Sequence, residues 1–352
     1  YLLSAFHYNW LLYYIHSELS NYYFFIFKLN DFWLPTIIRL NTFFFSFLIF
    51  IFLAKTYNQF YKSRLNYLIA FYLIFGPLTG FWVISAKPDM TYLLFEMFGL
   101  FLIIKNINML NHKKVIMITF VLFLAWSVKQ NAIVTISTFG FYLLIGKYYK
   151  YLLTSIFSFF LLVFATINFG PNNLFESILW QNGAALSFDM KHFFDVFLDS
   201  ISKSLVIYVV LLSFLLNVAS KRIFFSEIKK IKNCNKSKFV FFGILISFSQ
   251  IIFSLHYGSA VNYYFLSIFY ISIFLISYIN FADKFLINFS IFLQIALIVL
   301  IITGVKGRIK PNNYKNVNEY AQCVKNLESP ILNLGEYYRL PWITPDKKSN
   351  PI

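Results

Sequence analysis

Long apolar runs, separated by short polar breaks, constrain this chain more than any other feature of its sequence. Of its 352 residues, 59% are hydrophobic and only 12% are charged, and 47 are phenylalanine. Soluble domains carry about twice that share of charged residues, whereas a membrane-spanning helix needs about 20 mostly apolar residues in a row. The sequence therefore predicts an all-α polytopic membrane protein.

Ten of these runs are predicted to span the membrane, with the shorter ones extending into their flanks. They cover residues 34–54, 65–84, 90–104, 115–126, 132–147, 150–169, 204–219, 239–256, 259–279 and 285–304. The loops on one side of these spans contain 16 lysines and arginines and two acids, whereas the other side, before residue 305, has six basic residues. Basic loops favour the cytoplasm, so the opposite loops, residues 1–33 and the C-terminal segment are predicted to lie outside.

This arrangement also explains the net charge of +16, because the lysines occupy short loops rather than a continuous basic surface. Nucleic acid is therefore not an expected partner. The membrane is expected to be a prokaryotic inner or plasma membrane, with the active face extracytoplasmic.

We expect two parts, a transmembrane domain at residues 1–304 with a long outer loop at 170–203, and an extracytoplasmic segment at 305–352. Apolar residues at helical spacing between Met190 and Ile201 predict an amphipathic helix at the outer membrane surface. A second such pattern from Val317 to Leu327, followed by residues 331–334, indicates the start of a small α/β domain. Because the chain begins at Tyr1, without methionine, and ends soon after that start, we expect it to be incomplete at both ends.

Three polar islands interrupt the apolar runs on the predicted outer face: residues 87–89 (KPD), 129–131 (KQN) and 256–263 (HYGSAVNY). Charged and amide groups gathered at one membrane boundary have a desolvation cost that usually has a functional reason. Asp89 begins a span after Pro88, which is also ordinary helix-entry chemistry. Glu96, two turns further along the same face, is predicted to face the bundle interior, with a structural hydrogen bond and a proton role both open.

The other two islands offer groups for a phosphate and a sugar. Lys129, next to Gln130, can bind a phosphate as a point charge, although its head group can equally reach water while its stem lies along apolar neighbours. His256, Asn262 and Tyr263 supply imidazole, amide and hydroxyl groups suited to a sugar. Tyrosines are also expected at a membrane boundary for structural reasons.

Several other chemistries have no support in the sequence. Phosphate-binding glycine loops, nucleophile elbows and metal-ligand spacings are all missing from it. Cys234 and Cys323 fall on opposite predicted sides of the membrane, so they cannot pair. No cofactor is assigned, and a divalent metal is left open.

The order of these features resembles that of the GT-C superfamily, the polytopic glycosyltransferases that include protein O-mannosyltransferases and lipid A aminoarabinose transferases. The similar stretches are HYNWLLYY at 7–14, LPTIIRLN at 34–41, SAKPDM at 85–90, VKQN at 128–131, GSAVNYY at 258–264 and SPILNL at 329–334. Two positions depart from the family pattern, since Trp10 replaces a proline and Lys87 replaces the arginine before the Pro-Asp pair.

The resemblance implies a membrane glycosyltransferase, a hexosyl or pentosyl transferase that takes its sugar from a polyprenyl phosphate at the outer leaflet. Transfer would invert the anomeric carbon, and the acceptor would be a lipid, a glycan or a protein of the cell envelope. The main catalytic base of the family is usually in the first outer loop, which would precede Tyr1. Asp89 matches the second acidic position, where it would organise the site or help to activate the acceptor.

By the same resemblance, Arg39 and Lys129 would bind the phosphate of the carrier, and Asn262 with Tyr263 would contact donor or acceptor. Lys87, Gln130 and His256 complete the predicted substrate-binding set.

The main alternative is a transporter or flippase of a lipid-linked sugar, which predicts polar groups near the bilayer midplane and broken helices. A membrane scaffold without enzymatic activity would leave the polar islands unexplained, and an O-antigen ligase would need arginines in its main loop, where residues 170–203 have none.

Overall fold

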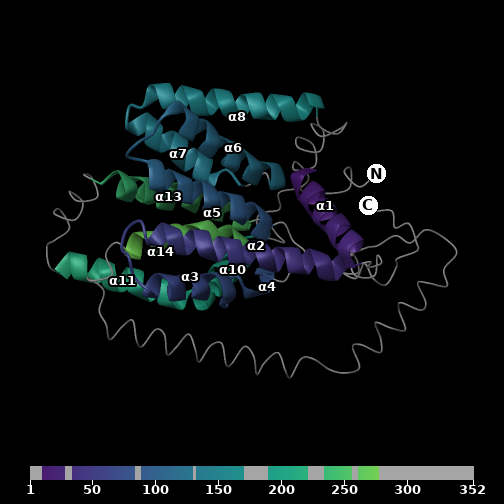
Figure 1. Cartoon of the computed structure of the whole chain (residues 1–352). Helices are drawn as coiled ribbons and strands as arrows, with labels where there is room; N and C mark the ends of the chain where they lie inside the picture. The colour runs from purple at the N-terminus through teal and green to yellow at the C-terminus, as the bar shows by residue number, and fades with distance from the viewer. Residues whose placement is uncertain are drawn as a thin grey trace, which may run out of the picture.

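The described part of the chain is a bundle of helices. The computed structural model describes residues 10–27, 34–83, 89–129, 132–169, 189–220, 234–255 and 261–276. Every regular element within these ranges is a helix, and most of the helices run side by side along a common direction (Figure 1). The all-α class predicted from the apolar runs is confirmed for the described residues.

The helices of the first half of the chain are α1 (Trp10–Phe27), α2 (Leu34–Tyr57), α3 (Leu65–Phe75), α4 (Gly80–Val83), α5 (Asp89–Asn106), α6 (His112–Val128), α7 (Val134–Ile145) and α8 (Tyr149–Phe169). Those of the second half are α10 (Met190–Lys203), α11 (Leu205–Ser220), α13 (Asn235–Ile251) and α14 (Phe265–Ile276). Two short 3₁₀ helices, η2 (Ile252–Leu255) and η3 (Val261–Tyr264), lie between α13 and α14.

Helices α5 and α14 form the core of the bundle. All 12 residues of α14 are buried, and α5 is buried on almost every side by α2, α6 and α7. A helix that is apolar all round needs neighbours or lipid on every face. Helix α8 lies at the edge of the bundle (Figure 1) and packs against α6 and α7. Its residues Leu153, Phe157 and Phe160 are exposed.

Two helices are long and apolar enough to cross a membrane by themselves. These are residues Thr36–Tyr57 of α2 and Tyr149–Asn168 of α8. The pair Met190–Lys203 and Leu205–Leu216, which is bent by 84°, would be a third if it formed one span. Membrane character is therefore supported, whereas a count of ten spans is not established by the described helices.

The predicted span at 65–84 is broken in the structure. It divides into α3 and α4 at Gly76–Thr79, because Pro77 has no N–H to donate to the carbonyl of Leu73. The buried hydroxyl of Thr79 donates to that carbonyl instead, at 2.7 Å, and to the carbonyl of Ile74 at 2.6 Å. The Thr79 hydroxyl thus supplies a partner for two backbone carbonyls at the break.

The amphipathic helix predicted between Met190 and Ile201 is present as α10. Asp189 caps it by accepting a hydrogen bond from the His192 N–H at 3.1 Å, and its own N–H donates to the Leu255 carbonyl at 2.9 Å. Met190, Phe194 and Leu198 are exposed along one side of the helix. Its contacts with η2 and η3 place α10 over the segment that contains Asn262.

Nine of the ten apolar runs contain described helices. The tenth run, 285–304, lies outside the described residues. The C-terminal segment 305–352, with the expected start of an α/β domain, lies outside them as well.

One helix was not predicted from the sequence. Residues Trp10–Phe27 form α1, where His16, Ser17 and Glu18 interrupt the apolar pattern. Contacts with α2 and α6 hold this helix against the bundle although it lacks a continuous apolar run.

Candidate functional site

The site is organised by the antiparallel pair α5 and α6. These helices have 18 and 17 residues and are joined by a short connection, so the first residue of α5 lies beside the end of α6. Gly99 allows the close approach, since a Cβ there would overlap the Leu122 side chain. Asp89 at the start of α5 and Lys129 just after α6 are thereby brought together, although they are 40 residues apart.

Asp89, Lys129 and Asn262 form one buried polar cluster, named here the Asp89 cluster. The Lys129 ammonium donates to Asp89 Oδ1 at 2.7 Å, and the Asn262 amide donates to the same oxygen at 2.6 Å. Asp89 is 1% exposed, and Lys129 and Asn262 are each 8% exposed. The cluster joins one residue from each of the three polar islands.

Two tyrosine rings flank the ammonium of Lys129. Its nitrogen lies 5.1 Å from the centre of the Tyr92 ring and 5.5 Å from that of Tyr263, within the range of cation–π attraction. Burial by itself would lower the pKa of Lys129, but the Asp89 carboxylate together with Tyr92 and Tyr263 raises that pKa above its usual value. Lys129 is therefore a permanently charged cation in the cluster.

The carboxylate of Asp89 has three sources of stabilisation. Besides Lys129 and Asn262, it lies in the first turn of α5, where the helix dipole favours negative charge. In contrast, the Oδ1 atom of Asn262 is buried and has no hydrogen-bond partner within the described ranges. Such an acceptor is costly to leave unpaired, so this oxygen is suited to receive a donor from a bound molecule.

Of the other residues predicted for the site, Tyr263 joins the cluster through its ring, as described above. Arg39 lies near the start of α2 with an exposed side chain and makes an interaction of its own, and the contacts that define the cluster do not include it. Lys87, Gln130 and His256 lie outside the described residues.

Tyr92 is part of the cluster but was not identified from the sequence. Its position three residues after Asp89 places both on one face of α5, and this spacing was the available signal. The tyrosine is buried, where an aromatic ring in an apolar run is ordinarily read as core.

The described residues hold no group of three or more His, Cys, Asp or Glu side chains that could bind a metal ion. Cys234 is exposed at the start of α13, and Cys323 lies outside the described residues. The polar groups of the Asp89 cluster are one carboxylate, one amide and one ammonium, a set suited to an anion and hydroxyl groups rather than to a metal.

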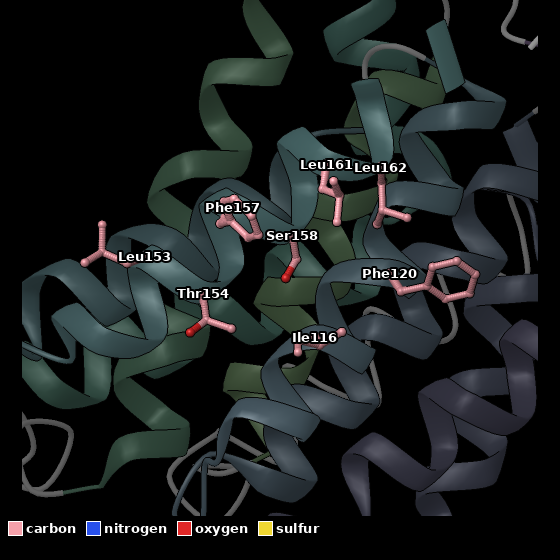
Figure 2. Close-up of a pocket in the computed structure, with 8 residues that line it drawn as sticks. All are labelled: Ile116, Phe120, Leu153, Thr154, Phe157, Ser158, Leu161 and Leu162. Atoms are coloured by element: carbon pink, nitrogen blue, oxygen red, sulfur yellow. The ribbon is translucent and has the colours of Figure 1, made fainter. Parts of the chain in front are cut away.

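An apolar groove of about 560 Å³ lies elsewhere, between α6 and α8. Its lining residues, labelled in Figure 2, are Ile116 and Phe120 of α6 and Leu153, Thr154, Phe157, Ser158, Leu161 and Leu162 of α8. None of these residues belongs to the Asp89 cluster. Towards the end of α6, Phe159 of α8 packs edge-on against Phe123 and Trp126.

The fold and this site define a helical protein of membrane character with a buried ion pair at one end of its central helices. No protein-family model, curated protein or solved structure matched the chain.

Proposed function

We propose that this protein transfers a sugar from a polyprenyl-phosphate donor to an acceptor at the outer face of the membrane, with inversion at the anomeric carbon. One observation carries the proposal: Asp89, Lys129 and Asn262, from three polar islands far apart in the sequence, meet in one cluster. The resemblance to GT-C glycosyltransferases, with its expectation of a lipid, glycan or protein acceptor, adds to it.

The chemistry of the cluster suits the leaving phosphate of such a donor. An ammonium has three N–H donors, and the bond to Asp89 accounts for one of them. A cation held in a buried site stabilises the charge that develops on a leaving phosphate far more than it would in water. Lys129 is therefore the group assigned to the phosphate.

Asp89 is better suited to organise the site than to act as its base. The same oxygen that would accept a proton already receives hydrogen bonds from Lys129 and Asn262, both of which stabilise the ionised form. This agrees with the expectation that the main base of the reaction comes from another segment. The unpaired oxygen of Asn262 is assigned to a sugar hydroxyl.

The test is transfer of a radiolabelled sugar from polyprenyl phosphate by the complete protein in liposomes. Asp89→Asn is expected to abolish transfer while the protein still inserts into the membrane, whereas the matched variant Asp199→Asn on α10 keeps its activity. Lys129→Ala is expected to raise the KM for the donor by roughly 10- to 100-fold, the loss of one charge-assisted hydrogen bond. Normal transfer by Asp89→Asn would remove this residue from the site.

A transporter or flippase of a lipid-linked sugar is the second candidate, and three observations favour it. The segment α3–α4 is broken at Pro77, α10 and α11 meet at 84°, and Glu96 is buried inside the bundle. Broken helices and intramembrane acids are common in transporters. Liposomes that contain the donor but no acceptor separate the two functions, because only a flippase moves the labelled donor between leaflets.

A further inference from the structure

Glu96 is a buried acid that the Asp89 cluster does not use. It lies seven residues after Asp89, two turns along the same face of α5, and is 0% exposed. Neither of its carboxyl oxygens has a hydrogen-bond partner within the described part of the chain. A polar side chain with this burial and two unsatisfied oxygens requires a physical explanation.

Two polar side chains from other helices surround this acid. The hydroxyl and the backbone N–H of Thr135, at the start of α7, lie near the Glu96 carboxyl, although neither meets the geometry of a hydrogen bond to it. The buried hydroxyl of Tyr270 on α14 donates to Thr135 Oγ1 at 3.1 Å. Gly243 on α13 makes room for the Tyr270 ring, since any Cβ there would overlap it. Four helices thus build this internal site.

No cation compensates Glu96 in the described structure. The two ion pairs found among the described residues are Asp89–Lys129 and Asp199–Lys203. The titratable groups that interact electrostatically with Glu96 are Tyr92 of its own helix and Tyr270 of α14. Helices α4, α7 and α14 carry no charged residue. The basic side chains of α2, α6 and α13 lie towards the helix ends, at Arg39, Lys55, His112, Lys113, Lys114, Lys236 and Lys238.

An ionised carboxylate in this position would be strongly unfavourable. Burial of a lone charge costs so much that the group neutralises itself instead, by taking up a proton or a metal cation. The polar groups described around Glu96 are the backbone of Thr135 and the hydroxyls of Thr135 and Tyr270, of which the second donates to the first. A metal cation needs more oxygen ligands than these, whereas a proton needs none beyond the carboxyl itself.

We propose that Glu96 is a proton-binding site inside the helical bundle, which holds a proton at pH values where exposed glutamates are ionised, with Thr135 and Tyr270 as the polar groups that face it. This inference is independent of sugar transfer. The surroundings of the two acids of α5 differ, because Asp89 has a cation beside it and Glu96 has none among the described residues.

Infrared difference spectroscopy on the purified chain tests this inference at about pH 6, where an exposed glutamate with its usual pKa is ionised. The wild-type protein is expected to show the carbonyl band of a protonated carboxylic acid, shifted in heavy water and lost in Glu96→Gln. Glu96→Asp keeps an acid at the site and should move this band rather than remove it. Asp199→Asn is the control, because Asp199 is exposed and paired with Lys203, so its loss should leave the band unchanged.

Thermal unfolding gives a second measurement on the same proteins. Since the folded wild type holds a proton that the unfolded chain releases, its melting temperature should fall as the pH rises from about 6 to about 9, and that of Glu96→Gln should fall less. An infrared band that is missing from the wild type, or that persists in a folded Glu96→Gln, would overturn the proposal. Stabilisation by sodium ions that depends on Glu96 would also overturn it, in favour of a metal cation.

Discussion

The buried ion pair between Asp89 and Lys129 should stabilise the bundle far more than an exposed pair of the same geometry. Their side chains are 2% and 11% exposed, with 2.7 Å between the charged atoms. Lys203 and Asp199 on α10 are equally close, at 2.6 Å, but their side chains are 29% and 44% exposed. The chain therefore contains its own control, in which the distance is matched and the burial differs.

Removal of one partner leaves the other charge buried, which costs about 3–5 kcal/mol. We expect this loss for Lys129→Met, because Asp89 is then stabilised only by Asn262 and the helix dipole. Asp89→Asn should also destabilise the protein, since the Lys129 ammonium keeps only the tyrosine rings. For the exposed pair, an i,i+4 contact contributes only about 0.3–0.5 kcal/mol, so Lys203→Met and Asp199→Asn should have little effect.

A double-mutant cycle isolates the interaction within each pair. The variant with both Asp89→Asn and Lys129→Met contains no unpaired charge, so it should lose less stability than the two single losses together, by about 2 kcal/mol or more. The free energy of unfolding is measured by equilibrium denaturation in mixed micelles, followed by circular dichroism. Equal coupling energies in the buried and exposed pairs would show that burial does not strengthen this contact.

Three further predictions concern packing, the broken span and the membrane orientation. Gly243→Ala should cost about 1–3 kcal/mol because the new Cβ overlaps the buried Tyr270 ring, whereas Gly140→Ala, with 3.9 Å to its nearest neighbour, should be neutral or stabilising in the same unfolding assay. Thr79→Val should cost about 1–3 kcal/mol, since the carbonyls of Leu73 and Ile74 lose their hydroxyl donor, and an unchanged melting temperature would contradict this role. Lys87→Cys and Lys229→Cys are made separately in a chain whose native cysteines are replaced. A membrane-impermeant thiol reagent should label these two positions from opposite sides of the membrane. Labelling of both from one side would refute the predicted topology.

The helices were largely predictable because each one satisfies its own backbone hydrogen bonds. A run of apolar residues such as 34–54 or 150–169 becomes a helix wherever it lies, and α2 and α8 follow these runs closely. The prediction failed at 65–84, where Pro77 divides the run into α3 and α4, and at α1, where polar residues interrupt the pattern. At 65–84 a proline divided an apolar run into two helices, and at α1 polar residues hid a helix from a search for apolar runs.

The membership of the site was predictable only in part. Asp89, Lys129, Asn262 and Tyr263 were selected because polar groups at a membrane boundary are expensive, and the structure brings them together. Tyr92, Thr135 and Tyr270 were missed, because an aromatic or threonine inside an apolar run gives no sign of what it faces. Glu96 was recognised as a buried acid, but its neighbours come from α7 and α14, far along the chain.

The amino-acid sequence was sufficient for the helical class, the positions of most helices and the amphipathic α10, since these depend on residues within one or two turns of each other. Only the packed structure decided which polar groups meet. Asp89 is 40 residues from Lys129 and 173 from Asn262, and their contact depends on the matched lengths of α5 and α6 and on the position of η3. The same packing gave Asp89 a cation and left Glu96 without one, so two similar acids on one face of one helix have different chemistry.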